Sequence, residues 1–249
     1  NIKSLVERYW TDEQNVIRPV NALKHLQQWC EQFQGYNQQD AHEAYLCFIE
    51  GIHKALIGQE LVPRYHKLIK DQEAVKQWDQ EKPSIITEMF MGQLKVTVDD
   101  THYETFRSLE LSPTYDTSVD ALVFDYFKKE TTSDSDMVIG RRLNYPPIVL
   151  ALSIKQFFRK YTIDIKKKLD LSWYVDEPFK KVKYKLYGVI LHGGDRHGGH
   201  YISMTKWNGQ WYENNDSRVR KVNFEDIRTN SIYMLFYLMD NNSFSLMSS

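Results

Sequence analysis

Apolar positions in the first third of the chain recur at helical spacing. Between Pro19 and Phe33 they lie three or four residues apart, which predicts a helix with Pro19 in its first turn. The polar stretch "QGYNQQD" (34–40) breaks this pattern, and a second predicted helix begins near Asp40, with Glu43 in its first turn. The expected inward stripes are Ala22, Leu23, Leu26, Trp29, Cys30 and Phe33 in the first helix, and Ala41, Tyr45, Phe48, Ile52 and Ala55 or Leu56 in the second.

The pattern changes to strand-like alternation after about Lys82. A strand is predicted where Phe90, Leu94, Val96 and Val98 alternate with their neighbours, and "PPIVLALSI" (146–154) is apolar on both faces, as a strand buried between layers is. The segment "SVDALVFDYF" predicts a short helix with Ser118 as its N-cap. Further strands are predicted at "KVKYKLYGVIL", "HYISMTKW" and "SIYMLFYLM". Helices come first and mostly antiparallel strands follow, so the predicted class is α+β.

Composition narrows the possible partners. The 249 residues carry a net charge of −1, so bulk charge indicates neither a nucleic-acid nor a membrane partner. The chain begins with Asn and shows no signal-peptide pattern, which is compatible with a fragment, a processed chain or an artificial boundary. Its two cysteines, Cys30 and Cys47, form no CxxC pair, which excludes a zinc site made of thiolates alone. We expect both to be unbonded thiols in a reducing compartment.

The stretch around His200 combines features of a catalytic base. Gly198 and Gly199 allow another backbone to pass close by, and the alternation that follows places His200 at the start of a strand. Asn208-Gly209 predicts a two-residue hairpin turn, which brings the next strand back beside it. Asn215 or Asp216 can then bond one ring nitrogen, fix the tautomer and leave the other nitrogen as a base. The spacing fits two members of a Cys-His-Asn/Asp constellation.

Two other interpretations compete with this one. "HGGDRHGGH" gathers His192, Asp195, His197 and His200 in nine residues, as a metal site could, but a glycine-rich loop rarely preorganises ligands. His192 and His197 are then interpreted as solvated loop histidines. Similarly, the polar residues of "GYNQQDAHEAYL" (35–46) could simply cap a helix.

Taken together and in order, these stretches resemble the ubiquitin-specific proteases. "GYNQQDAHEAYL" resembles their QQDAHEFL-type box, and "GGHYISMTKWNGQWYENNDSRV" (198–219) resembles their histidine box. "YPPIVLALSIKQF" (145–157), "SIYMLFY" (231–237), "ITEMFMGQLKVTV" (86–98) and "FRSLELSP" (106–113) resemble further strands of the family. The likeness covers most of residues 16–238.

This resemblance implies a papain-like cysteine protease fold of thumb, palm and fingers, with an incomplete thumb. It implies a thiol isopeptidase that cleaves after the C-terminal glycine of ubiquitin, inside the cell in the cytoplasm or nucleus. We expect neither a cofactor nor a metal, because four Cys or His ligands cannot be assembled from the fingers region. Ubiquitin or a ubiquitinated protein is the implied partner. The implied catalytic residues are His200, Asn215 and Asp216, and the implied ubiquitin-tail residues are Gln39, Asp40, Glu43, Gly198, Gly199 and Tyr201. The Gly193 to Gly199 stretch is the implied mobile loop that covers the tail.

The sequence departs from the family most clearly at the nucleophile. No cysteine box precedes the QQD box, and the paired finger cysteines are absent. Cys30 lies on an apolar stripe and Cys47 lies inside a helix, so neither has the helix N-terminus and cationic neighbour that activate a thiolate. The box aromatic before Asn-Asp is replaced by Asn214 and the Phe of "HEFL" by Tyr45, which affects packing more than chemistry.

Two functional hypotheses remain open. We favour a deubiquitinase whose nucleophilic cysteine lies upstream of this chain, so that the chain alone is inactive. The alternative is an inactive ubiquitin-binding or scaffold module, and the ordered motifs argue against an unrelated α+β binding domain. We expect one catalytic domain over residues 1–249, with thumb helices in 1–85, palm and fingers in 86–240, and a tail in 241–249.

Overall fold

In the computed structural model, the described residues are 20–35, 37–57, 65–131, 138–156, 159–179, 181–195, 198–240 and 243. Contacts divide the chain into two compact units, Asn1–Ala55 and Leu56–Ser249, here called the N-terminal and C-terminal units. Pro19, the expected first helical residue, lies outside the described residues. The expected division at residue 85 stays a prediction.

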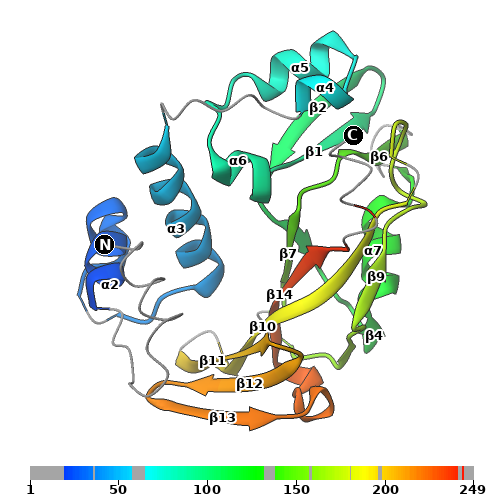
Figure 1. Ribbon diagram of the computed structural model, residues 1–249. Helices are drawn as coiled ribbons and strands as arrows, with labels where there is room; N and C mark the ends of the chain where they lie inside the picture. The colour runs from blue at the N-terminus through cyan, green and yellow to red at the C-terminus, as the bar shows by residue number, and fades with distance from the viewer. Residues whose placement is uncertain are drawn as a thin grey trace. The chain divides into compact units, whose positions relative to one another are not determined.

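The N-terminal unit is helical, as its apolar spacing predicts. Its elements are α2 (Val20–Trp29), the 3-10 helix η1 (Glu31–Phe33) and α3 (Ala41–Leu56), whose last residue belongs to the C-terminal unit. α2 and α3 lie side by side (Figure 1). The two helices approach closely at Gly51 of α3, because a methyl group there would overlap the ring of Trp29 in α2. Leu26, Phe33 and Cys47 form the buried cluster between them.

Two details of the expected helical stripes are wrong. Leu23 was expected inward but is 51% exposed. In α3 the buried residues are His42, Cys47, Ile49, Gly51 and His53, and the expected stripe residues are only partly buried or exposed. Apolar character alone therefore misplaced the inward face, because this helix buries a glycine and two histidines instead.

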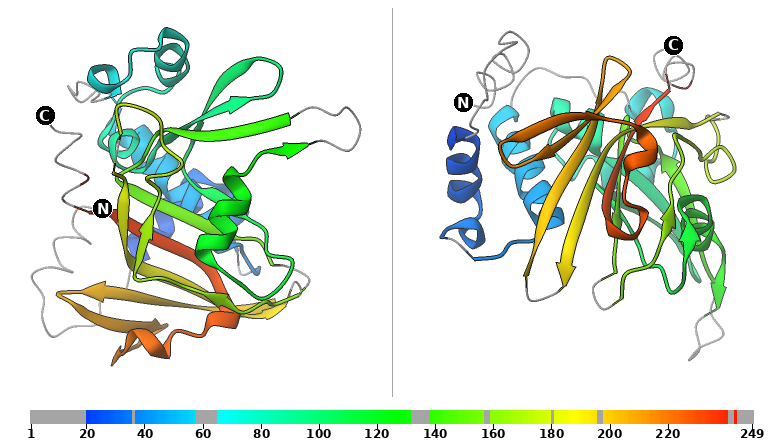
Figure 2. Two further views of the ribbon diagram at one scale, coloured as in Figure 1. Left: turned by 90° about the vertical axis from the view of Figure 1, so that its right-hand side faces the viewer. Right: turned by 90° about the horizontal axis from the view of Figure 1, so that it is seen from below.

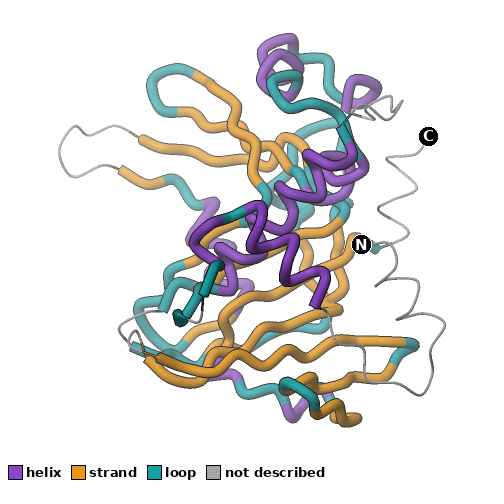
Figure 3. Tube along the Cα trace, turned by 90° about the vertical axis from the view of Figure 1, so that its left-hand side faces the viewer, coloured by secondary structure: helices purple, strands orange, loops and turns teal. Residues whose placement is uncertain are grey.

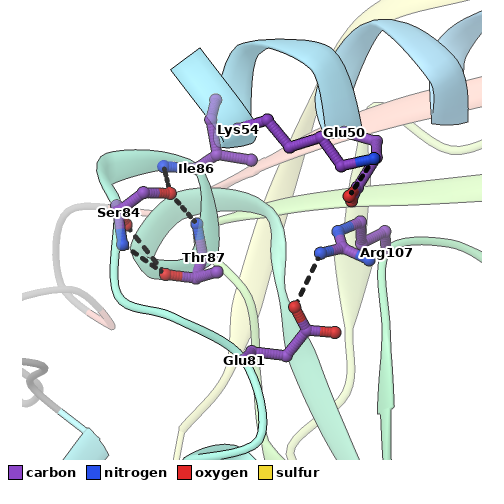
Figure 4. A network of polar contacts seen from close by, with 7 residues as sticks. All are labelled: Glu50, Lys54, Glu81, Ser84, Ile86, Thr87 and Arg107. Carbon is purple, nitrogen blue, oxygen red and sulfur yellow. Dashed lines mark hydrogen bonds and ion pairs between the residues drawn. The ribbon is translucent and has the colours of Figure 1, made fainter. Parts of the chain in front are cut away.

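The C-terminal unit opens with short helices and continues mainly as strands (Figure 3). The helices are α4 (Tyr65–Leu68), α5 (Gln72–Trp78), α6 (Ile85–Phe90), α7 (Val119–Phe127), η2 (Phe224–Asp226) and η3 (Thr229–Ser231). Ser84 caps α6 through a reciprocal capping box with Thr87, and nearby Arg107 pairs with Glu81 at 3.1 Å (Figure 4). Phe90 thus ends a helix instead of beginning the predicted strand.

A four-stranded sheet follows α6, in the order β2-β1-β6-β5. Its strands are β1 (Gly92–Thr97), β2 (Thr101–Phe106), β5 (Glu130–Thr131) and β6 (Val138–Tyr145). The β1–β2 hairpin projects away from the helices beside it (Figure 2). Buried Gln93 ties β1 to its surroundings: its amide nitrogen donates to the Ala74 carbonyl at 2.9 Å, and its oxygen accepts from Tyr65 and Asn144.

The larger sheet has the order β13-β12-β11-β10-β14-β7-β3, with β9 also paired to β10. Its strands are β3 (Leu109–Leu111), β7 (Val149–Ile154), β9 (Lys168–Asp170), β10 (Lys183–Asp195), β11 (Gly198–Trp207), β12 (Gln210–Asn215), β13 (Arg218–Val222) and β14 (Ile232–Met239). All neighbours are antiparallel except β3 and β7. Every residue of β7 is buried, as its continuous apolar run predicts. The α+β class is confirmed.

Helix α7 packs against β3 of this sheet and β6 of the four-stranded sheet, and a small parallel pair, β4 (Thr117–Ser118) and β8 (Ile163–Asp164), adjoins it. The Ser118 hydroxyl accepts from the Ala121 amide at 3.2 Å, which confirms Ser118 as the N-cap. Val119 and Leu122 are buried as predicted, and Tyr126 is partly buried. No described helix has the length and apolar character needed to cross a membrane.

Candidate active site

His200 lies on β11, where the sequence predicted it. Its neighbour on one side is β10, with Gly193 paired to His200, and on the other side β11 turns into β12 (Figure 1). Asn208 and Gly209 have positive φ angles of 45° and 83°, as a tight two-residue hairpin turn requires. The predicted hairpin is therefore confirmed, and it returns the chain to the His200 strand.

The register of this hairpin places Asn215 beside His200. Ser203 pairs with Asn214, so Asn215 follows opposite Ile202. His200 lies two residues before Ile202 and shares its face of the sheet, which makes His200 and Asn215 diagonal neighbours. The His200 Nε2 and Asn215 Oδ1 atoms are 2.7 Å apart.

That contact determines which ring nitrogen carries the proton. An amide oxygen can only accept a hydrogen bond, so Nε2 of the neutral ring must be the donor. Nδ1 then has the lone pair and can accept a proton from another group. Asp216 lies farther away, with Oδ2 3.8 Å from Nε2, and its side chain is 80% exposed while that of His200 is 51% exposed. Asn215 is thus the direct partner and Asp216 a solvent-screened neighbour.

Glycines shape the hairpin tip that leads to His200. A methyl group on Gly199 would overlap the His192 ring and the Gly193 carbonyl oxygen, so close approach requires glycine there. Gly194 has a φ of 123° and lies against the backbone of Gly198 and Gly199. A methyl group on Gly198 would meet nothing within 4 Å, so the fold itself does not require glycine there, and the approach of another backbone to Gly198 stays a prediction.

The stretch expected to be a covering loop is mostly paired strand. β10 continues to Asp195 and β11 begins at Gly198, with Asp195 opposite Gly198 and Gly194 opposite Gly199. The tip, residues 196–197, and the Asp195 side chain lie outside the described parts, so the His197 and Asp195 metal hypotheses are not addressed there. Among the described residues, no three His, Cys, Asp or Glu side chains gather as metal ligands would.

His192 has a role that the sequence interpretation missed. It is partly buried on β10, not a solvated loop residue, and its ring stacks on Tyr201 at a centroid distance of 4.5 Å. Both rings also contact Tyr233 edge-on. Lys160 Nζ lies 3.5 Å from His192 Nδ1, and burial lowers the pKa of this lysine. The hairpin register, which pairs His192 with Tyr201, was the signal that could have revealed this cluster.

The QQD segment, in the N-terminal unit, forms the start of α3. Asp40 Oδ1 accepts from the amides of His42 and Glu43 at 2.7 and 3.1 Å, so Asp40 caps the helix. Gln32 contacts Gln39 and Glu43, the other two predicted tail residues of this segment. Its backbone carbonyl accepts from Gln39 Nε2 at 2.5 Å, and its own Nε2 donates to Glu43 Oε2 at 3.0 Å. The capping interpretation is therefore confirmed for Asp40, and it is compatible with a further binding role.

The two cysteines are not separate thiols. Cys30 and Cys47 form a disulfide, with Cα atoms 6.5 Å apart, and neither is free. The expectation of two unbonded thiols is wrong. The physical reason is that the end of α2 and the middle of α3 meet at the unit's small core, which sequence spacing does not reveal. A cysteine in a disulfide has no thiolate, so neither is a nucleophile in this state.

Helices come first in the chain and a largely antiparallel sheet follows, with a His-Asn pair on one of its hairpins, as expected for a papain-like α+β protein. The sequence profile described as "Ubiquitin carboxyl-terminal hydrolase" matches residues 1–237. The chain therefore belongs to the ubiquitin carboxyl-terminal hydrolase family, within its ubiquitin-specific protease branch.

Individual relatives agree with this assignment. Ubiquitin carboxyl-terminal hydrolase 2 of Homo sapiens is 28% identical over 279 residues, covering 94% of this chain and 46% of the relative. The Drosophila melanogaster Usp2 is 24% identical over 273 residues, covering 94% of this chain and 29% of the relative. The chain thus spans about half the length of the human relative, or less than a third of the fly one.

Solved structures agree in fold. The SAGA Ubp8/Sgf11/Sus1/Sgf73 DUB module bound to ubiquitin aldehyde is similar with a TM-score of 0.71 and 21% identity, covering 96% of this chain and 64% of that one. A yeast SAGA DUB module has a TM-score of 0.65 and 25% identity, covering 82% of this chain and 49% of that one. The papain-like fold predicted from the resemblance is confirmed.

Proposed function

We propose that this chain is the base-carrying part of a thiol deubiquitinase that cleaves the isopeptide bond after the C-terminal glycine of ubiquitin. The observation that carries the proposal is the 2.7 Å contact between His200 Nε2 and Asn215 Oδ1. This contact leaves Nδ1 as a proton acceptor on a rigid strand, which a general base needs. The proposed substrate class, ubiquitin conjugates, follows from the relatives: one is named a ubiquitin carboxyl-terminal hydrolase, and a similar solved structure is bound to ubiquitin aldehyde.

The nucleophile in this proposal is a third cysteine, outside the 249 residues. Its thiol gives a proton to His200 Nδ1, and the thiolate attacks the carbonyl carbon of the terminal glycine. The His200 imidazolium then returns the proton to the leaving lysine amine, and a thioester remains. Water, deprotonated by His200, hydrolyses the thioester and releases the ubiquitin carboxylate and the thiol.

Asn215 and Asp216 make unequal contributions to this chemistry. Asn215 holds the ring in the reactive tautomer and orientation through a direct hydrogen bond. Asp216 stabilises the imidazolium only through a solvent-exposed gap of 3.8 Å, a setting in which ion pairs are worth roughly 0–1 kcal/mol. We therefore assign the orienting role to Asn215 and a minor electrostatic role to Asp216.

The ubiquitin tail is the proposed ligand of the remaining residues. Asp40 and Glu43 are carboxylates that can meet a basic tail, and Gln39 lies just before them. Gly198, Gly199 and Tyr201 lie next to His200, and Gly198 has open space where a side chain would be. A Gly-Gly terminus has no side chains, so its backbone can come close to these residues.

The test of the base is His200→Ala in the full-length protein that contains the third cysteine. Turnover of a ubiquitin–fluorophore conjugate should fall by about three orders of magnitude or more. Ubiquitin affinity, measured by titration calorimetry, should change less than about twofold, because binding uses a broad surface. The matched control is His102→Ala, which removes an exposed histidine paired with Glu104 on β2. Normal turnover in His200→Ala would refute the proposal.

Cys30 and Cys47 give a second test, on the 249-residue chain itself. Because both are in the disulfide, an electrophilic ubiquitin probe that traps active-site thiols should not label this chain. Ubiquitin binding without labelling is the expected result. Labelling that disappears on Cys30→Ala or Cys47→Ala would show that one of these residues is the nucleophile and would overturn this placement.

A further inference from the structure

Strand β13 forms one edge of the larger sheet, next to the candidate active site. It pairs with β12, and within the described residues no strand pairs with its outer side. Arg218, Val219, Arg220 and Lys221 are all exposed, and Val219 is 62% exposed. The opposite edge is different, because Leu109 and Leu111 of β3 are buried.

The backbone of β13 offers hydrogen-bonding groups to an added strand. Asn215 and Arg218 flank the two-residue turn at Asp216–Ser217, so they form the hydrogen-bonded pair that closes this hairpin. Alternation then directs the N–H and C=O groups of Arg220 toward β12 and those of Val219 and Lys221 outward. The outer edge can therefore bond an extended chain at two residues.

The side chains give this edge a positive charge. Arg220 is already used, because it forms a bidentate pair with Glu213 at 2.8 and 3.0 Å. Arg218 and Lys221 make no ion pair with a described residue. Arg218 lies directly opposite Asn215, the partner of His200. Two available cations therefore lie close to exposed Val219 along β13, and one of them, Arg218, is one strand away from Asn215 and two strands away from the proposed base.

We propose that the outer edge of β13 binds an acidic, extended segment of the ubiquitinated protein by strand addition. This inference rests on the proposed function, because His200 returns a proton to the lysine of that protein, which must then lie close by. Strand addition supplies affinity through the main chain of Val219 and Lys221. Carboxylates on the segment pair with Arg218 and Lys221, which makes acidic flanking sequence the specificity-determining feature.

A charged edge has a simpler possible purpose, since like charges protect edge strands from aggregation. That explanation predicts no dependence of cleavage on the sequence around the modified lysine. The two explanations therefore differ in a measurable quantity, which is the ratio of kcat/KM for acidic and neutral substrates.

The first experiment uses the full-length enzyme and three substrates. Two are ubiquitin–peptide isopeptide conjugates of equal length, one with Asp and Glu around the lysine and one with Asn and Gln. The third is a ubiquitin–fluorophore conjugate without a peptide. The acidic conjugate should be cleaved with about fivefold higher kcat/KM than the neutral one, the size expected for two exposed ion pairs. The ratio should decrease as salt is raised.

A double variant tests the side chains. Arg218→Gln with Lys221→Gln should bring the ratio close to one, while the fluorophore conjugate reports any effect of the lost charge on His200. The matched control is Lys129→Gln with Lys168→Gln, two exposed lysines located just before β5 and on β9, which should keep the wild-type ratio. Loss of the preference in the control as well would indicate general electrostatics and overturn the assignment to β13.

A backbone variant tests strand addition. Val219→Pro removes an N–H group that faces away from β12, a position where edge strands accept proline. It should reduce the acidic preference, whereas Val219→Thr, which keeps the N–H group, should retain it. An equal rate for acidic and neutral conjugates in the wild type would refute the inference. If the enzyme cleaved none of the three substrates, that result would instead refute the proposed function.

Discussion

Each of the two units of this chain is stabilised internally, and the means differ between them. In the N-terminal unit the buried cluster contains Leu26, Phe33 and Cys47, and a disulfide joins Cys30, just after α2, to Cys47 in α3. In the C-terminal unit a single large cluster runs from the short helices through both sheets. Small assemblies bury too little apolar surface to be stable alone and are often cross-linked, whereas large cores need no such link.

This difference separates the two sets of candidate residues as well. Gln39, Asp40 and Glu43 lie inside the segment that the disulfide closes, between Cys30 and Cys47. His200 and Asn215 lie on a hairpin of the sheet with the large core. We infer that geometry at the histidine depends on packing, while geometry at the QQD segment depends partly on one covalent bond.

The largest expected effect comes from the sheet core. Leu152 in β7 is completely buried, so Leu152→Ala should lower the free energy of unfolding of the C-terminal unit by about 4 kcal/mol. Leu238→Ala, at a residue of β14 that is 44% exposed, is the control and should cost well under about 2 kcal/mol. Chemical denaturation followed by Trp fluorescence measures both. Equal effects of the two substitutions would contradict the single-core description.

The next effect should be specific to the N-terminal unit. Cys30 and Cys47 are separated by 17 residues, and closing a loop of this size stabilises a fold by about 3 kcal/mol. Cys30→Ser with Cys47→Ser, or a dithiol reductant, should therefore speed amide hydrogen exchange in α2 and α3. Exchange in β7 and β14 should stay unchanged, and the reductant should have no effect on the double variant. Uniform acceleration across the chain would show that the two units are not independent.

The sequence predicted elements well where local chemistry was sufficient. The β7 run, the Ser118 cap and the Asn208-Gly209 turn each depend on residues close together in the chain, and each was confirmed. The His200–Asn215 contact was accessible for the same reason, because a tight hairpin fixes the register between its strands. Signals between residues that are close in the sequence were therefore sufficient to predict these parts of the sheet and the candidate base.

The errors have a common physical origin in long-range packing. The disulfide requires α2 and α3 to meet at particular residues, and helical spacing does not determine that meeting point. His192 became a stacking partner of Tyr201 only because β10 continues past it to Asp195. Helix α6 was missed because its last residue, Phe90, fits the alternation of the strand that follows, while its capping box at Ser84 involves Thr87 instead of the usual Glu or Gln.

The smallest effect concerns the helix caps, one in each unit. Asp40 and Asp71 both accept backbone amides at a helix start, but Asp71 Oδ2 also accepts from the Tyr103 hydroxyl at 2.6 Å. The hydrogen bond from Tyr103, followed by those from the Ala74 and Glu73 amides, lowers the pKa of Asp71. The folded state therefore favours the ionised carboxylate, and this stabilisation is fully present above the ordinary aspartate pKa, near pH 4.

Asp71→Ala should consequently lower the free energy of unfolding at pH 7 by about 1 kcal/mol, the usual worth of an N-cap. The difference between wild type and variant should shrink as the pH falls below about 4, because protonation removes the stabilisation as the pH passes through the lowered folded-state pKa. Tyr103→Phe keeps the cap but removes the phenol, so the pKa of Asp71 should move back toward its ordinary value. Urea denaturation between pH 3 and 7 measures these differences. A wild-type advantage over Asp71→Ala that stayed constant to pH 3 would contradict the Tyr103 contact as its source.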